Sequence, residues 1–272
     1  MVREFSYTSF CSLDELLGFL ALHGADASVF SGGTDLFVNI RAGLARPRHV
    51  VDLKKIPEFR ELSFSETDGL SIGASVTVNE LIQDVTVRER YAILTAAGEE
   101  LATYPLRNRA TVAGNIVTAS PCGDMSPPLL CLGARVELRS VRGTRTMPIA
   151  EFITGVKQTR IAADEIVSRI IVPVDRIDAR GGYRKLKRIK GHDLGLVAVA
   201  LVKARTVVRA AISSAAPTPV LLPEFAVDTP PEEVVRTARA AISPIDDVRC
   251  TAEYRSFMVG VYIRRLMEEV PA

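Results

Sequence analysis

PLRNRATVAGNIVTASPCGDMSPP, residues 105–128, is the stretch on which our interpretation of this chain depends. Its centre, residues 111–115, joins small residues to a hydroxyl and an amide, and Asp124 follows. Small residues let a phosphate approach backbone N–H groups, while hydroxyl and amide side chains add hydrogen bonds to phosphate or sugar oxygens. The spacing matches neither GxGxxG nor the P-loop pattern. The stretch therefore predicts either a phosphate-binding loop of another kind or an ordinary turn between a helix and a strand.

A second loop with the same character lies nearer the N-terminus. Residues 31–35, SGGTD, follow an apolar run at 28–30 and precede a run at 36–40 that is typical of a helix. Glycines before a helix start leave free N–H groups beside the positive end of the helix dipole, which suits a pyrophosphate. A Gly-Gly turn in which Thr34 or Asp35 caps the helix is the structural alternative.

Five motifs occur in a fixed order along the chain. They are SGGTDL (31–36), IGASVT (72–77), LRNRATVAGNIVTASPCGDMSPPLL (106–130), YRKLKRIKGHDL (183–194) and AEYR (252–255). The ordered set resembles the FAD-binding (medium) subunit of the molybdenum hydroxylases, the family of xanthine dehydrogenase and aerobic carbon monoxide dehydrogenase. SGGTDL alone is a weak signal, whereas RNxATxxGN followed by SPxxD is specific. The resemblance extends from about residue 3 to about residue 268.

This resemblance implies an α+β fold with two domains. A two-part FAD-binding domain of the PCMH/VAO type is expected at residues 1–174, with subdomains at about 1–54 and 55–174. A smaller α+β C-terminal domain is expected at 182–272, after a polar linker at 175–182. The residue pattern by itself favours several elements. The expected helices are at 13–24, 36–40, 78–85, 88–102, 125–132, 232–242 and 252–269, and the expected strands at 28–30, 50–53, 69–76, 134–141, 144–149 and 165–172, with strand- or helix-capable runs at 183–189, 196–203 and 206–213.

The resemblance also assigns a role to individual residues. Backbone N–H groups of the first loop are expected to cradle the FAD pyrophosphate, the second loop to complete the cradle, and two further residues to contact the phosphate–ribose portion. In that order the expected FAD-binding residues are Ser31, Gly32, Gly33, Thr34 and Asp35, then Thr111, Ala113, Gly114 and Asn115, then Thr118 and Asp124, with Leu194 added from the segment near the flavin ring. Ala110 and Ala113 stand where the family usually has glycine. Which side chain covers the isoalloxazine ring is left open, because His192-Asp193-Leu194 stands near the place where some members have an aromatic residue.

Lys185 is the one candidate for a catalytic role. The resemblance places it near the flavin ring, where a cation would favour the anionic reduced flavin. The alternative is a solvated basic edge strand, since residues 185–190 read KLKRIK and lysines protect exposed strand edges from aggregation.

Composition limits the remaining possibilities. The chain has 272 residues, 47% hydrophobic and 24% charged, as in ordinary globular proteins, and its net charge of only +2 argues against a nucleic-acid binder. The N-terminus lacks the apolar core of a signal peptide, and the longest apolar run, 196–202, is too short to span a bilayer, so we expect a cytoplasmic protein. The four cysteines form no CxxC pair and the three histidines are scattered, so no metal site is expected.

The function that the resemblance implies is electron transfer. FAD would be held non-covalently here, molybdopterin would belong to a large partner subunit, and [2Fe-2S] clusters to a small one. The flavin would receive electrons from these clusters and pass them to NAD⁺, dioxygen or another acceptor within a hetero-oligomer, so the chain would not act on the organic substrate by itself. Two alternatives stay open: a stand-alone FAD-dependent small-molecule oxidoreductase, and a non-catalytic scaffold with the same fold. The lack of a GxGxxG motif argues against a Rossmann-type NAD enzyme.

Overall fold

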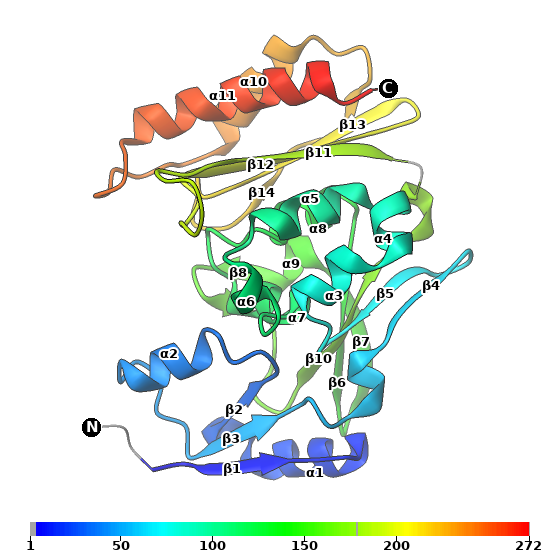
Figure 1. Cartoon of the computed structure of the whole chain (residues 1–272), viewed down its shortest axis with the longest axis vertical. Coiled ribbons are helices and arrows are strands. Elements are labelled where there is room, and N and C mark those ends of the chain that lie inside the picture. The colour runs from blue at the N-terminus through cyan, green and yellow to red at the C-terminus, as the bar shows by residue number, and fades with distance from the viewer. Residues whose placement is uncertain (1–3, 178, 272) are drawn as a thin grey trace.

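A computed structural model describes residues 4–177 and 179–271 and shows three stacked units (Figure 1). The N-terminal unit is a three-stranded parallel sheet in the order β1-β3-β2, formed by β1 (Ser6–Ser9), β3 (His49–Asp52) and β2 (Ala27–Phe30). Parallel neighbours need crossover connections, which here contain α1 (Leu13–His23) and α2 (Leu36–Arg41). The predicted helix 13–24 and the strands at 28–30 and 50–53 are confirmed within one or two residues, whereas β1 is an element that the pattern did not predict.

The middle unit is built on a five-stranded antiparallel sheet in the order β4-β5-β10-β6-β7. Its strands are β4 (Leu62–Ser65), β5 (Gly69–Gly73), β10 (Ile166–Val172), β6 (Arg135–Ser140) and β7 (Gly143–Pro148). The predicted hairpin across Arg142-Gly143 is confirmed, with Ser140 opposite Gly143. β10 lies at the centre of this sheet, and five of its seven residues are buried, as expected for a strand with neighbours on both sides.

Short helices cover this sheet. They are α3 (Val78–Gln83), α4 (Val85–Arg90), α5 (Ala92–Glu100), α6 (Tyr104–Arg107), α7 (Val112–Thr118), α8 (Ser126–Cys131) and α9 (Ile149–Phe152). The capping box at Thr77 is confirmed: its hydroxyl accepts from the Glu80 N–H, and a Glu80 carboxylate oxygen accepts from the Thr77 N–H at 2.7 Å. The single helix predicted at 88–102 is wrong. Tyr91, with φ −133° and ψ 41°, separates α4 from α5 and buries its ring near Phe64.

The C-terminal unit is an antiparallel sheet of β11 (Arg180–Leu186), β12 (Val197–Ala204), β13 (Val207–Ser213) and β14 (Val220–Leu221), with β15 (Phe225–Ala226) beside β13. The three ambiguous runs are therefore strands. The helices predicted at 232–242 and 252–269 are confirmed as α10 (Pro231–Ala241) and α11 (Ala252–Glu269), and both cover one face of this sheet (Figure 1). The predicted linker at 175–182 is too long, because β11 already begins at Arg180; Asp178 of that linker lies outside the described residues.

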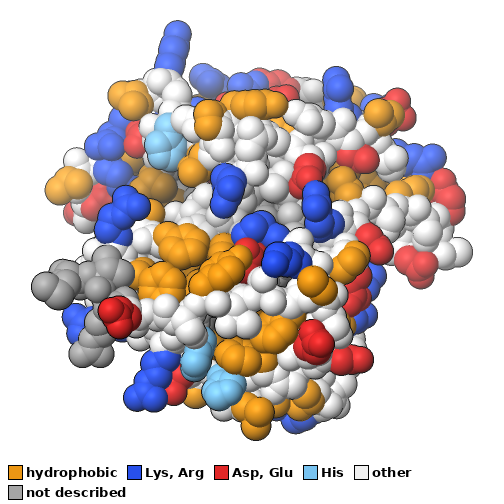
Figure 2. All heavy atoms as spheres, turned by 60° about the horizontal axis from the view of Figure 1, so that its bottom comes forward, with side chains coloured by type: hydrophobic (Ala, Val, Ile, Leu, Met, Phe, Trp, Pro, Cys, Tyr) orange, Lys and Arg blue, Asp and Glu red, His pale blue; other side chains and the backbone are white. Residues whose placement is uncertain are grey.

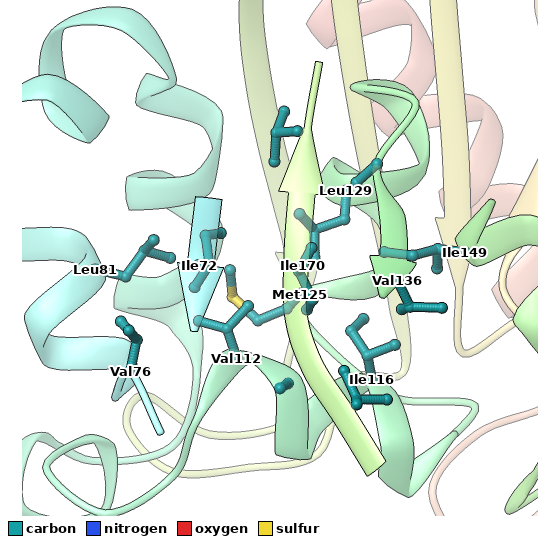
Figure 3. Close-up of a cluster of buried hydrophobic side chains, with 14 of the residues drawn as sticks. Ile72, Val76, Leu81, Val112, Ile116, Met125, Leu129, Val136, Ile149 and Ile170 are labelled. Atoms are coloured by element: carbon teal, nitrogen blue, oxygen red, sulfur yellow. The ribbon is translucent and has the colours of Figure 1, made fainter. Parts of the chain in front are cut away.

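The other face of the C-terminal sheet belongs to the core of the middle unit. Ala198, Ala200 and Val202 of β12 are buried in the same cluster as the residues of the middle sheet and of α8. Figure 3 shows Val112 and Ile116 of α7 among the buried side chains of this cluster, which include Ile72, Val136 and Ile170 of the sheet. Because Val112 and Ile116 are buried in this core, the opposite side of α7 faces away from it.

No helix of the described residues is long and apolar enough to cross a membrane. On the face shown in Figure 2, lysine and arginine side chains are interspersed with aspartate and glutamate. This mixture agrees with the small net charge of +2.

Candidate cofactor-binding site

A cleft opens where the N-terminal unit meets the middle unit. Its empty volume is about 1000 Å³, including the open mouth. Both glycine-containing loops line it, so the structure brings together two segments that are about 80 residues apart in the sequence. Ten of the predicted residues line the cleft: Ser31, Gly32, Gly33, Thr34, Asp35, Thr111, Ala113, Gly114, Asn115 and Thr118.

The first loop presents unused backbone donors. Gly33 has φ +71°, a conformation that favours glycine, and its carbonyl accepts from the Phe37 N–H at 3.1 Å as α2 begins. Within the described part of the chain, the N–H groups of residues 32–35 donate to no backbone acceptor. Asp35 occupies the N-cap position without a capping hydrogen bond and lies 3.7 Å from Lys157 instead. The capped-turn alternative is therefore not formed, and the loop leaves its N–H groups available to an anion.

The second loop is partly helical, which corrects the expectation of a loop. Thr111 caps α7, because its hydroxyl accepts from the Gly114 N–H at 3.0 Å. The side-chain oxygen of Asn115 accepts from the Met125 N–H at 3.2 Å and ties α7 to the segment before α8. Ala113 and Gly114 line the cleft and add little side-chain bulk to its wall. The sequence showed the composition of the site but not its helical backbone.

The two loops are packed against each other through glycine. A Cβ on Gly32 would lie 2.1 Å from the Arg109 carbonyl oxygen, far closer than any side chain can approach. The Ser31 hydroxyl also donates to the Ser75 hydroxyl at 3.0 Å, and both residues are buried. These contacts join the N-terminal unit to the middle unit at the base of the cleft.

Apolar side chains form most of the remaining wall. They come from β2, the end of β3, α5, α6, α7 and β10 and include Val29, Leu53, Leu101, Leu106, Val117, Ile161, Ile166 and Val167. Sequence reasoning missed all of these residues, because an apolar side chain that faces a ligand has the same appearance in sequence as one that faces the core. The strand predicted at 165–172 is confirmed as β10, but the sequence could not indicate that residues 165–167 border a cleft.

Glu165 is a charged residue of the cleft wall that is held by several hydrogen bonds. Its carboxylate accepts two hydrogen bonds from Arg145, both at 2.7 Å, and one from the Ala162 N–H at 2.9 Å. Hydrogen bonding from Arg145 lowers the pKa of Glu165 below its usual range, although burial opposes the shift. The side chain is therefore an anion that fixes the 160–165 segment at the edge of the cleft.

This ion pair gives the protein an acid-sensitive contact. A carboxylate with a lowered folded pKa contributes stability above its unfolded pKa, here about 4.5, and loses it as the pH falls through the folded value. We expect Glu165→Gln to lower the free energy of unfolding at pH 7 by about 1 to 2 kcal/mol. The difference from the wild type should shrink below pH 4.5. Urea unfolding at a series of pH values measures it, with exposed Glu151→Gln as the control; a difference independent of pH would contradict the assignment.

Three predicted site residues do not line the cleft. Asp124 and Lys185 form an ion pair of 2.9 Å, and the Tyr183 hydroxyl donates to the other Asp124 oxygen at 2.8 Å. Lys185 also donates to the Glu100 carbonyl at 3.1 Å, and only 2% of its side chain is exposed. Burial raises the pKa of Asp124 against the opposing effect of Lys185, and burial raises the pKa of Tyr183 well above its usual value. The cluster joins α5, the segment before α8 and β11 behind the cleft.

Leu194 lies apart from this cluster. Its side chain is 56% exposed in the connection between β11 and β12. Asp193 holds this connection, because its carboxylate accepts from the backbone N–H and the guanidinium of Arg188. Those hydrogen bonds lower the pKa of Asp193 to about 2. The alternative prediction for residues 185–190 was a solvated basic edge. It holds for Arg188, whereas Lys185 is buried.

The cleft suits a long ligand with a negatively charged centre. The small residues of both loops leave backbone donors open to phosphate oxygens, and the apolar side chains of the cleft wall suit flat ring systems. This combination defines a dinucleotide-binding domain without the Rossmann fingerprint. Residues 3–175 match the family described as "FAD binding domain in molybdopterin dehydrogenase". The chain belongs to this family, and the predicted family, the α+β fold class and FAD as its cofactor are confirmed.

Similarity to proteins of this kind extends over nearly the whole length of the chain. The carbon monoxide dehydrogenase medium chain of Afipia carboxidovorans is 31% identical over 99% of this chain and 97% of its own, and that of Hydrogenophaga pseudoflava is 29% identical over 97% and 96%. The putative xanthine dehydrogenase FAD-binding subunit of Escherichia coli is 27% identical over 98% and 96%. A chain of Cu,Mo-CO dehydrogenase superposes with a TM-score of 0.93 at 29% identity, covering 99% of this chain and 98% of that one. The chain is thus a member of an oxidoreductase family.

Proposed function

We propose that this chain is the FAD-binding electron-transfer subunit of a molybdenum-containing hydroxylase. The observation that carries the proposal is the convergence of residues 31–35 and 111–115 on one cleft in a chain of this family. Electrons would arrive from [2Fe-2S] clusters of a small partner subunit and leave to NAD⁺, dioxygen or another acceptor. The chain would not oxidise the organic substrate itself, since that reaction belongs to the molybdenum cofactor of a large subunit.

The cleft residues have distinct tasks in this proposal. The N–H groups of Gly32, Gly33 and Thr34 bind the diphosphate, and Asn115 with Thr118 completes the polar side of the cleft. Apolar residues from β10 and α6 exclude water from the rings. FAD, when bound, supplies reversible acceptance and donation of electrons.

Asp124 and Lys185 support the site from behind in this scheme. Their buried ion pair fixes β11 against α5, and α5 ends next to Leu101 of the cleft wall. The alternative that we propose is direct contact, of Asp124 with the phosphate–ribose portion of the cofactor and of Lys185 and Leu194 with its ring end. A buried ammonium near the ring end would stabilise negative charge on a reduced flavin.

The subunit assembly is inferred from the descriptions of the relatives. Relatives named as medium chains or subunits, such as the nicotine 6-hydroxylase medium subunit of Paenarthrobacter nicotinovorans, which is 29% identical, are parts of larger enzymes. We therefore propose a cytoplasmic hetero-oligomer with a molybdenum-cofactor large subunit and a [2Fe-2S] small subunit. We also propose the division into a FAD-binding domain at 1–174 and a C-terminal domain at 182–272; the family match, which ends at residue 175, supports this boundary.

The absorption spectrum of the purified chain tests the proposal first. We expect flavin bands near about 370 and 450 nm and release of FAD by heat, as for a non-covalent flavoprotein. A colourless protein that takes up no added FAD would instead favour the non-catalytic scaffold.

Reduction experiments then separate the electron-transfer subunit from a stand-alone oxidoreductase. Bleaching of the flavin by NADH alone would identify NAD⁺ as the acceptor of the complex, because the transfer is reversible. Bleaching by a hydroxylatable organic substrate should require co-purified molybdenum and iron–sulfur subunits. Bleaching by that substrate with the isolated chain would support the stand-alone alternative and overturn the subunit assignment.

A further inference from the structure

A lysine outside the recognised motifs holds the first loop from behind. Lys54, two residues after β3 ends, donates from Nζ to the Ser31 carbonyl at 3.2 Å and to an Asp52 carboxylate oxygen at 2.7 Å. The same ammonium lies 4.3 Å from the centroid of the Phe30 ring. Three contacts thus fix a side chain that is still 40% exposed.

Asp52 anchors this lysine. The carboxyl group is buried, and its oxygens accept from the Lys54 N–H at 2.9 Å, from the Lys54 ammonium and from the Tyr7 hydroxyl at 2.7 Å. Burial by itself would raise the pKa of Asp52, but hydrogen bonds from Lys54 outweigh it, and the pKa lies below its usual value. The anchor is therefore charged at neutral pH, and a charged acceptor makes the stronger hydrogen bond to an ammonium.

The geometry of the peptide unit links Lys54 to the cleft. In a trans peptide the C=O of one residue and the N–H of the next point in opposite directions. Holding the Ser31 carbonyl on Lys54 therefore turns the Gly32 N–H away from Lys54, and Gly32 lines the cleft whereas Lys54 does not. Lys54 thereby determines the direction of the first donor of the loop without touching the ligand.

This orientation matters because the lining of the cleft contains no lysine or arginine. Among the described lining residues the ionisable side chains are Asp35 and Glu165, both acidic. A diphosphate in this cleft is bound by backbone N–H groups and neutral side chains, whose strength depends on their direction. We propose that Lys54, held by Asp52 and Tyr7, is a positioning residue for the cofactor diphosphate. The inference rests on the proposed binding of FAD in this cleft.

The test compares Lys54→Met, Lys54→Arg and Lys55→Met in the full chain. Lys55 is exposed next to Lys54, so its variant makes the same change in charge without the Ser31 contact. FAD affinity is measured by fluorescence titration of the cofactor-free chain, and the ³¹P spectrum of bound FAD is recorded. We expect Lys54→Met to weaken FAD binding about tenfold. Its diphosphate resonances should move while the visible flavin spectrum is unchanged, Lys54→Arg should recover most of the affinity, and Lys55→Met should match the wild type.

Each other outcome has a defined meaning. Lys54→Met with the affinity and ³¹P spectrum of Lys55→Met overturns the positioning role and leaves the FAD site intact. A wild-type chain that binds no FAD overturns the proposed function instead. If Lys54→Met does not fold, Tyr7→Phe replaces it, because this substitution removes the hydrogen bond to Asp52 and keeps the ring beside Phe30. Tyr7→Phe should shift the diphosphate resonances in the same direction, and an unchanged spectrum overturns the proposal.

Discussion

Asp124→Ala is expected to lower the free energy of unfolding of the cofactor-free chain by about 3 to 5 kcal/mol. The substitution leaves the Lys185 ammonium, with 2% of its side chain exposed, without its carboxylate partner at 2.9 Å. It also removes the acceptor of the buried Tyr183 hydroxyl. An uncompensated buried charge costs more than the ion pair itself contributes, since solvation cannot replace the lost partner.

Urea unfolding of the cofactor-free protein measures this loss and separates it from any role in FAD binding. Replacing both partners, as Asp124→Leu with Lys185→Met, should recover much of the stability, because neither charge then remains buried. The exposed ion pair between Arg264 and Glu232, at 2.6 Å, is the control, and Glu232→Ala should change stability little. Asp124→Ala with wild-type stability would show that the cluster is not structural and would favour direct contact of Asp124 with the cofactor.

The composition of the two loops made the site predictable from sequence. Gly32, Gly33 and Gly114 with Thr111 and Asn115 are residues that favour close approach of a phosphate, and all five line the cleft. Capping at Thr77 and the hairpin at Arg142-Gly143 were predictable for the same reason, since each depends on residues a few positions apart. Local chemistry was therefore sufficient for these features.

Features that depend on distant partners were not predictable from local pattern. The break at Tyr91 follows from burial of its ring near Phe64, and nothing within its own helix period signals it. Lys185 was expected near a ring on the basis of resemblance, but its ammonium is paired with a carboxylate 61 residues away. Lys54 carries no motif at all, and its contact with Ser31 depends on the parallel pairing of β2 with β3. Only the arrangement of strands brings such residues together.

Gly32→Ala is expected to weaken FAD binding by about 100-fold and to lower the free energy of unfolding by about 1 to 3 kcal/mol. The added Cβ would lie 2.1 Å from the Arg109 carbonyl oxygen, 2.9 Å from its carbon and 3.2 Å from the Ala110 Cα. All three atoms belong to the backbone, so no side-chain rotation relieves the clash and the loops must separate. The cost is steric, because Gly32 does not have the positive φ of Gly33.

Fluorescence titration with FAD and urea unfolding measure the two effects of Gly32→Ala separately. Gly18→Ala is the matched control: Gly18 lies inside α1, and a Cβ there meets nothing within 4 Å. It should keep wild-type affinity and gain up to about 1 kcal/mol of stability from helix propensity. Gly32→Ala with the affinity of Gly18→Ala would contradict a cofactor held between the two loops. If Gly32→Ala lowers the affinity for FAD by more than its loss of stability accounts for, the diphosphate lies at the junction of the two loops. Separating the loops would then remove donors from both sides of one ligand.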